Sequence, residues 1–469
     1  MLQYESTPYI FNLLFDIIFK APIYVIFLEG FLLLMVIWVL IHKQTNGSRK
    51  LTEEQKKEII KNWKPEPLVP EVDENDPTLK TRTVEGPIGK YIFVDGHKCL
   101  NMSTFNYLGL EEYPQIKKSA IETIRKYGVG SCGPRGFYGT LDVHLELEER
   151  LAKFMDQEEA VVYSYAFSTI ASAIPAYSKR NDIIFADECV NFAIQKGIDA
   201  SRSKVVYFKH NNMRDLEEKL IEQHKMDVKK PQKAAKMRRF LVAEGIYLNT
   251  GEMCPLRELV QLRSKYKLRM ILDESVSFGT IGKHGRGLTE FLGVDKTEVD
   301  LISASLEASV ESVGGFCVGT HFIVEHQRLS GLGYCFSASQ PPLLTQVVIT
   351  ALDIFEKEPK IFKDLNEVCE KVDKKFKELS RFLLRGHPIS PIKHLYLKDD
   401  KTSSETDEIL RKISDQCIKM GLAIVPCAYL PIEKFPQKPS LRVAVNRLLS
   451  NEEITKAFNI LQRASYEIK

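Results

Sequence analysis

The glycine-dense segment 128–139 carries side chains that could contact a ligand. Five of its twelve residues are glycines, and Cys132, Arg135 and Tyr138 lie among them. Because glycines let the backbone approach another group closely, the segment predicts a site for a ligand or for the edge of a second subunit. A dinucleotide-binding motif is the alternative. It needs a preceding strand, whereas a helical pattern precedes this segment and Pro134 interrupts it.

A carboxylate and two hydroxyls elsewhere in the chain suit a phosphorylated ring compound. Asp273 ends an apolar run, at the sheet edge where open α/β folds bind ligands, and could pair with a protonated pyridine nitrogen. Capping the next turn is the alternative. Ser337 and Ser339 precede a proline pair that begins a helix, and hydroxyls and helix-start amides suit a phosphate. Ordinary N-capping is the alternative there.

The elements that must position these residues follow an α/β pattern. From about residue 114, short apolar runs alternate with helical patterns. Runs of this length, apolar on both faces, predict a mostly parallel seven-stranded sheet covered on both sides by helices. The seven runs are 161–163, 182–185, 204–208, 240–244, 270–273, 301–303 and 315–319.

We expect four regions along the chain. The first 50 residues form a membrane anchor, and residues 51–90 form a short amphipathic helix followed by a proline-rich linker. Residues 91–345 form a large α/β domain that opens with a hairpin around Asp95–Gly96, a pair typical of a type I′ turn. Residues 346–469 form a smaller α+β domain, with helices in 349–382 and 405–422 and strands at 394–397, 422–425 and 441–445.

The anchor rests on residues 23–41, whose only charge is Glu29. About 20 such residues cross a bilayer, and the span can begin near residue 16. Lys43, Arg49 and Lys50 follow the run, so the positive-inside rule predicts a single-pass protein with a cytosolic large domain. A cleaved signal peptide and an interfacial helix are the alternatives, although no basic stretch precedes the run and no small-residue cleavage site follows it.

Composition excludes other classes of function. The net charge of +3, from 65 basic and 62 acidic residues, gives no basic footprint for nucleic acid. Nine scattered cysteines show no metal-ligand spacing, so we expect reduced thiols and no metal site.

In this order, the segments resemble the α-oxoamine synthase family of fold-type I pyridoxal-phosphate enzymes. The resemblance implies the fold-type I architecture and a cofactor held by a lysine. Within the family, the apolar N-terminal run, residues 132–140 and residues 334–339 resemble the non-catalytic subunits of membrane-bound, heterodimeric members. The matching motifs are Asn-Tyr-Leu-Gly at 106–109, the glycine loop with His144 and Glu148, Val-Ala-Glu-Gly at 242–245, residues 273–279, Gly-Arg-Gly at 285–287 and the pair Gly314–Gly315.

The departures from the family pattern fall on the chemical positions. No lysine lies between Lys296 and Lys357, and Ala308 stands six residues before the paired glycines, where catalytic members carry the Schiff-base lysine. Val276 and Asn191 replace the family's two histidines near the cofactor. The resemblance therefore implies no catalytic residue on this chain, with Asp273 kept as a vestigial cofactor contact.

The resemblance implies a silent subunit paired with a lysine-bearing homologue in the endoplasmic reticulum membrane. That homologue would bind pyridoxal phosphate, and the pair would condense L-serine with palmitoyl-CoA to 3-ketodihydrosphingosine in sphingolipid biosynthesis. Small activating subunits and membrane regulators would contact the N-terminal helix. Cys132, Arg135 and Tyr138 would line the partner's substrate pocket, with Arg135 pointing across the interface, and Ser337 and Ser339 would approach the partner's cofactor phosphate. A pure scaffold and a self-sufficient enzyme are the alternatives.

Overall fold

The computed structural model describes residues 22–45, 51–69, 79, 81–399, 401–427, 429–430 and 432–468. It divides the chain into two compact units, Met1–Thr81 and Arg82–Lys469. Residues 16–21, where the predicted span begins, lie outside the described residues.

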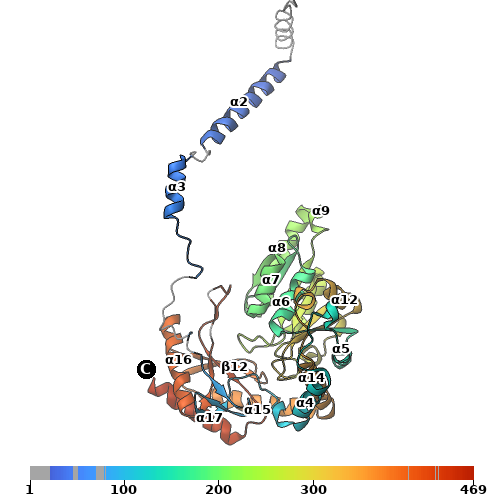
Figure 1. Ribbon diagram of the computed structural model, residues 1–469, viewed down its shortest axis with the longest axis vertical. Coiled ribbons are helices and arrows are strands. Elements are labelled where there is room, and N and C mark those ends of the chain that lie inside the picture. Colours follow the sequence, from blue (N-terminus) through green and yellow to red (C-terminus); the bar gives the residue numbers. More distant parts are fainter. Residues whose placement is uncertain are drawn as a thin grey trace, which may run out of the picture. The chain divides into compact units, whose positions relative to one another are not determined.

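The described residues of the first unit form the helices α2 (Ile23–Thr45) and α3 (Glu53–Asn62) (Figure 1). The stretch Ile23–Ile41 of α2 has a mean hydropathy of 2.6 and no buried residue. Nineteen helical residues extend about 28 Å, close to the thickness of a bilayer's hydrocarbon core. The predicted apolar N-terminal helix is therefore confirmed as a candidate membrane span.

The second unit is built on a seven-stranded sheet of order β4-β10-β9-β8-β7-β5-β6. Its strand β10 runs antiparallel to both neighbours, and every other adjacent pair is parallel. Strands β5, β9 and β10 are buried along their whole length because, apart from Asp187, their residues are apolar or small on both faces. The mostly parallel sheet is confirmed, with strands β4 Glu159–Tyr163, β5 Ile183–Asp187, β6 Lys204–Phe208, β7 Arg239–Glu244, β8 Arg269–Asp273, β9 Leu301–Ser305 and β10 Gly315–Gly319.

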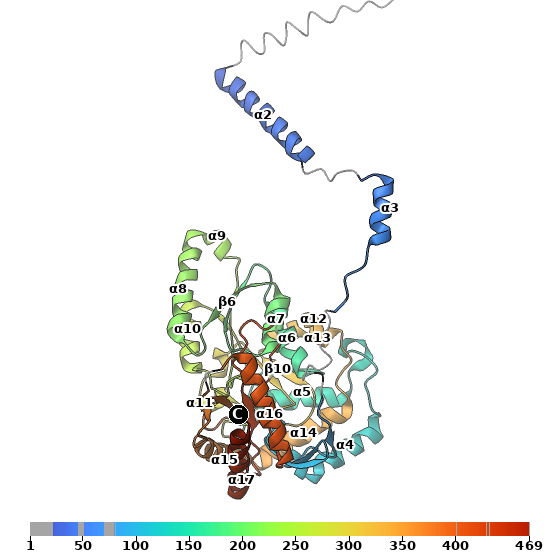
Figure 2. The same ribbon diagram turned by 90° about the vertical axis from the view of Figure 1, so that its left-hand side faces the viewer.

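Helices connect the strands, and α14 packs against α4 and α5. Near the C-terminus, α15 and α16 both pack against α17 (Figure 2). The helices of this unit are α4 Pro114–Tyr127, α5 Asp142–Phe154, α6 Ala166–Tyr177, α7 Phe192–Ser201, α8 Met213–Lys229, α9 Pro231–Ala234, α10 Leu256–Tyr266, α11 Leu288–Leu292, α12 His321–Ser330, α13 Leu332–Cys335, α14 Pro342–Lys357, α15 Lys360–Phe376, α16 Ser403–Lys419 and α17 Asn451–Glu467.

Two smaller sheets complete the unit. One is antiparallel, of order β11-β12-β15-β14, and the other has the order β1-β2-β3-β13. In the second sheet, Asp95 and Gly96 both have positive φ, 49° and 79°, as a type I′ turn requires, so the predicted hairpin is present. The strands are β1 Val84–Glu85, β2 Tyr91–Val94, β3 His97–Asn101, β11 Phe382–Arg385, β12 Ile392–Leu397, β13 Leu422–Ala423, β14 Val425–Pro426 and β15 Leu441–Ala444.

The predicted large and small domains are closely joined. Strand β13 pairs in parallel with β3, so a late segment completes the sheet of the N-terminal hairpin. One hydrophobic cluster extends from Leu100 to Ala464. The proposed boundary after residue 345 falls inside α14 and stays a prediction.

Candidate functional site

The glycine loop and the serine segment, which the sequence marked separately, lie side by side. Pro134 and Ala338 form an antiparallel bridge. The Ser339 amide donates to the Gly133 carbonyl at 2.9 Å, and the Ser131 hydroxyl donates to the Ser339 carbonyl at 3.0 Å. The two segments therefore form one site at the surface of the second unit.

The loop holds two non-glycine residues in left-handed backbone. Cys132 has φ 58° and Tyr138 has φ 64°. Each such residue costs about 1–2 kcal/mol. Gly139 must remain a glycine, because an added Cβ would lie 1.9 Å from the Gly133 carbonyl oxygen. Cys132 is exposed and the Tyr138 side chain is fully exposed, so the strained loop displays these two side chains outward.

Exposed apolar side chains surround the loop. The short helix α13 contacts both the turn Arg135–Gly139 and helix α6, and each of these three segments contributes to the patch. Exposed apolar side chains gathered on neighbouring segments are typical of interaction sites. We call this patch the loop surface; it comprises Phe137, Tyr138, Tyr165, Phe167, Leu332 and Phe336.

Arg135 does not belong to the loop surface. Its side chain is 4% exposed, and its guanidinium donates two hydrogen bonds, of 2.8 and 3.0 Å, to the Glu148 carboxylate on α5. It also donates to the Thr140 hydroxyl at 3.0 Å and lies 5.4 Å from the centre of the Tyr334 ring. The prediction that Arg135 points across an interface is therefore wrong: a buried carboxylate binds it inside the chain, where it fixes the loop.

The two serines differ in their surroundings. Ser339 is buried, and its hydroxyl donates to the Gly133 carbonyl at 3.2 Å. Ser337 is half-buried. Their approach to a partner's cofactor stays a prediction, as do the roles of Cys132 and Tyr138 in a partner's substrate pocket.

Asp273 lies at the carboxyl end of β8, in register with Glu244 at the end of β7. Both are buried. Oδ2 of Asp273 accepts a hydrogen bond from the Asn191 side-chain amide at 3.1 Å, and Oδ1 of Asp273 accepts one from the Ser275 backbone amide at 3.0 Å. Asn191 is held in place as the N-cap of α7, since its Oδ1 accepts from the Ile194 amide. The Asn191 side chain therefore takes up one of the acceptor positions of Asp273.

Burial sets the charge of these carboxyls. It raises the pKa of Asp273. Burial, reinforced by the charge of Asp273, raises the pKa of Glu244 to about 8, and burial raises the pKa of Glu274 to about 7. In the sequence, Glu244 stands out only as part of the motif at 242–245. The register of β7 and β8, which places it beside Asp273, has no local signal.

Replacing Glu244 with glutamine is expected to flatten the pH dependence of stability between about pH 4.5 and 8. Because folding raises the pKa of Glu244 from 4.5 to about 8, the folded chain keeps a proton that the unfolded chain has released. The free energy of unfolding therefore falls as pH rises through this range, and glutamine cannot ionise. Thermal unfolding of the detergent-solubilised chain across this range measures the effect, with the exposed Glu122→Gln as control. Parallel profiles for Glu244→Gln and the parent would contradict it.

Ala308 and Val276 are both buried. Ala308 lies between β9 and β10, where its methyl group offers no amine. Among the described residues, Lys393 on β12 is the one buried lysine. Its ammonium donates to the carbonyls of His387 and Pro388 and lies 3.4 Å from the Asp373 carboxylate.

Two groups of side chains among the described residues lie close enough to share a metal ion. The buried group is Asp187, Cys189 and His210. His210 contacts Asp187 through Nδ1 at 2.8 Å, and it contacts Glu252, outside the group, through Nε2 at 2.9 Å. Although burial lowers the pKa of His210, hydrogen bonds to Asp187, Cys189 and Glu252 outweigh it and raise the pKa to about 11. A histidine paired on both nitrogens serves to join the ends of β5 and β6 to the turn before α10. The other group, Glu159, His321 and Glu325, also binds Arg328.

Known proteins match most of the chain. The model of the aminotransferase class I and II family matches residues 97–461. Over 451 residues the chain is 39% identical to serine palmitoyltransferase 1 of Dictyostelium discoideum, covering 94% of this chain and 93% of that protein. It is 40% identical over 446 residues to long chain base biosynthesis protein 1b of Oryza sativa subsp. japonica, covering 94% and 91%. The identity to serine palmitoyltransferase 1 of Saccharomyces cerevisiae is 32% over 450 residues, covering 85% and 80%.

Solved structures match the fold. Serine palmitoyltransferase from S. paucimobilis, with a bound PLP–myriocin aldimine, superposes with a TM-score of 0.75 at 24% identity, covering 84% of this chain and 94% of that one. For 8-amino-7-oxononanoate synthase from Francisella tularensis the TM-score is 0.64 at 20% identity, covering 79% and 98%. With the family match, these likenesses confirm the fold-type I architecture predicted from the sequence.

Proposed function

Because this chain belongs to the class I and II aminotransferases and, among them, to the serine palmitoyltransferase 1 family, we propose that it is the non-catalytic subunit of serine palmitoyltransferase. Its role lies in the synthesis of sphingolipid long-chain bases. The enzyme would condense L-serine with palmitoyl-CoA to 3-ketodihydrosphingosine, and a lysine-bearing homologue, subunit 2, would complete the heterodimer.

The absence of an amine at Ala308 carries the proposal, and the hydrogen bond from Asn191 to Asp273 supports it. A covalently held pyridoxal phosphate needs a lysine amine and a carboxylate free to pair with its ring nitrogen. Here Ala308 supplies a methyl group in place of the amine, and Asp273 already accepts a hydrogen bond from the side-chain amide of Asn191. The residues present therefore do not fit a covalently bound cofactor, and we assign pyridoxal phosphate to the partner subunit.

The loop surface supports the part of the proposal that concerns the partner. Its exposed aromatic side chains are of the kind that anchor protein interfaces. Cys132 and Tyr138 would line the partner's substrate pocket, Ser337 would approach the partner's cofactor phosphate, and Arg135 would fix the loop from inside through Glu148.

The purified chain alone, incubated with pyridoxal phosphate and then dialysed to remove loosely held cofactor, is expected to show no visible Schiff-base absorbance and to retain no cofactor after borohydride reduction. No lysine lies in the loop between β9 and β10, and the buried Lys393 is occupied by Asp373 and two carbonyls. Absorbance spectra and intact-mass measurement check this. The co-purified heterodimer is the positive control and should carry the label on the partner alone. A reduced adduct on this chain would instead favour a self-sufficient enzyme.

The location follows from α2. We propose that it crosses the endoplasmic reticulum membrane once and leaves the second unit in the cytosol, since Lys43, Arg49 and Lys50 follow the apolar stretch. Small activating subunits and membrane regulators would contact this N-terminal region.

A pure scaffold is the second candidate. One observation favours it: Arg135, the charged residue of the loop, is bound inside the chain and is 4% exposed. The effect of replacing Tyr138 on activity separates the two candidates.

A further inference from the structure

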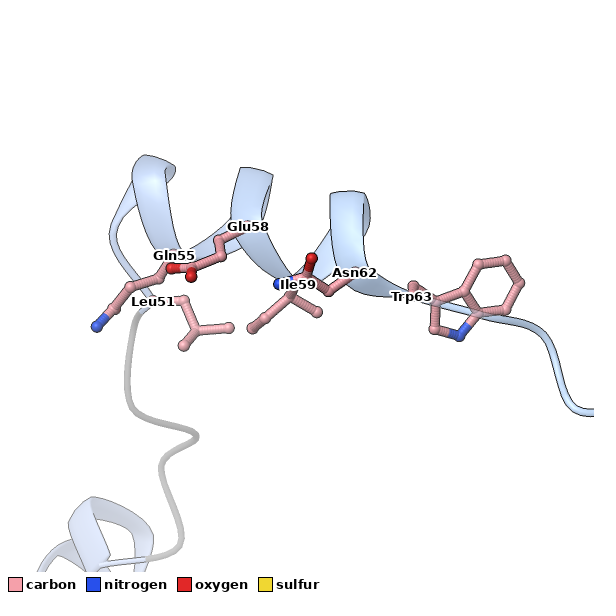
Figure 3. A pocket seen from close by; sticks show the side chains of 6 residues that line it. All are labelled: Leu51, Gln55, Glu58, Ile59, Asn62 and Trp63. Atoms are coloured by element: carbon pink, nitrogen blue, oxygen red, sulfur yellow. The ribbon is translucent and has the colours of Figure 1, made fainter.

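The short helix α3 exposes apolar side chains that it does not bury within the first unit. None of its residues is buried. Leu51 and Ile59 point to the same side of the helix, and Trp63 extends from its C-terminal end (Figure 3). Ile60 and Trp63 are 74% and 70% exposed. A helix with this much uncovered apolar surface is suited to binding something outside the unit.

The sequence specifies the helix locally but does not stabilise it by packing. The Thr52 hydroxyl accepts from the Gln55 amide at 3.3 Å, and the Gln55 side chain accepts from the Thr52 amide at 3.0 Å, which forms a capping box. Glu53 in the first turn and Lys61 in the last turn match the helix dipole. Isolated helices of about ten residues are nevertheless marginal in water. A surface that covers the apolar side chains would therefore stabilise α3.

A bilayer surface is within reach of α3. Five residues separate its flanking Leu51 from the end of α2 at Thr45, a distance of at most about 20 Å in extended chain. Six basic and three acidic residues lie between Arg49 and Lys64, so the segment carries net positive charge. Anionic lipid headgroups attract such segments, and tryptophan prefers the interface between headgroups and acyl chains.

We propose that α3 lies in the headgroup region of the membrane that α2 spans. Ile59, Ile60 and Trp63 face the acyl chains, while Lys57 and Lys61 contact anionic headgroups. This rests on the proposed membrane anchor. It adds a second attachment, parallel to the bilayer, before the proline-rich linker begins.

The chain offers a direct test because it has two tryptophans, Trp38 in α2 and Trp63 beside α3. The full-length Trp38→Phe variant makes Trp63 the single reporter, in vesicles of phosphatidylcholine mixed with phosphatidylserine. We expect its emission to shift to shorter wavelength, and lipids brominated near the headgroup to quench it more than lipids brominated deep in the acyl chain. Adding Lys57→Glu and Lys61→Glu should reduce this quenching, whereas Lys57→Arg and Lys61→Arg should preserve it.

Two results would overturn the proposal. If α3 lay in water, aqueous acrylamide would quench Trp63 and neither brominated lipid would. If α3 packed against protein, neither acrylamide nor the brominated lipids would quench it. The Trp63→Phe variant, which reports on Trp38, keeps the two hypotheses apart. If brominated lipids quench Trp38 and alkaline carbonate does not extract the chain, the anchor stands even when the α3 proposal fails.

Discussion

Replacing Arg135 with alanine is expected to lower the free energy of unfolding of the chain by about 3 kcal/mol. Breaking a buried ion pair by removing one partner typically costs about 3–5 kcal/mol. The lower end applies because Glu148, once freed from Arg135, keeps a 3.1 Å contact with Arg328. The variant also loses the hydrogen bond to Thr140 and the contact with the Tyr334 ring.

Chemical or thermal unfolding of the solubilised chain measures this loss, with the exposed Arg125→Ala as the matched control. The cycle of Arg135→Ala, Glu148→Ala and the double variant isolates the pair, since neighbouring residues are not additive. Unchanged stability, together with reduced activity of the heterodimer, would show instead that Arg135 acts on the partner.

The Tyr138→Gly variant is expected to lower the condensation activity of the reconstituted heterodimer about thirtyfold while leaving the chain itself at least as stable. A tyrosine that acts as an interface hot spot contributes about 2 kcal/mol, which is a factor of about 30. In the isolated chain the side chain is fully exposed, and glycine accepts its φ of 64° without strain. Activity and stability should therefore move in different directions.

Serine and palmitoyl-CoA kinetics, co-purification of the partner and unfolding of the free chain are the three measurements. Tyr138→Phe is the conservative control and should retain most of the activity if the ring makes the contact. Unchanged kinetics and assembly for Tyr138→Gly would favour the pure scaffold.

Much of the fold could be predicted because its signals are local. Each of the seven apolar runs overlaps an observed strand, and the pair Asp95–Gly96 forms the turn that its residue types favour. Strand order and register were not predictable in this way. They depend on contacts between segments far apart in the sequence, such as the pairing of Glu244 with Asp273.

The candidate site shows the same limit. The glycine content marked the loop at 128–139, but it could not indicate whether Arg135 points outward or inward. The inward direction of Arg135 is set by its hydrogen bonds to Glu148 in α5, the helix that follows the loop, and by its contact with the Tyr334 ring. The replacement at Asn191 was visible in the sequence as a lost histidine. Its hydrogen bond to Asp273 depends on the fold, which brings the start of α7 to the end of β8.

The parallel pairing of β3 with β13 has a consequence for synthesis of the chain. Leu100 pairs with Leu422, so the sheet that begins with the hairpin cannot be completed until almost the whole chain has left the ribosome. Until then the edge of β3 is unpaired, and open edges of this kind can join other strands. Contacts between such distant residues also form slowly. The nascent chain therefore has a long interval in which β3 needs protection, and β13 is the segment that ends it.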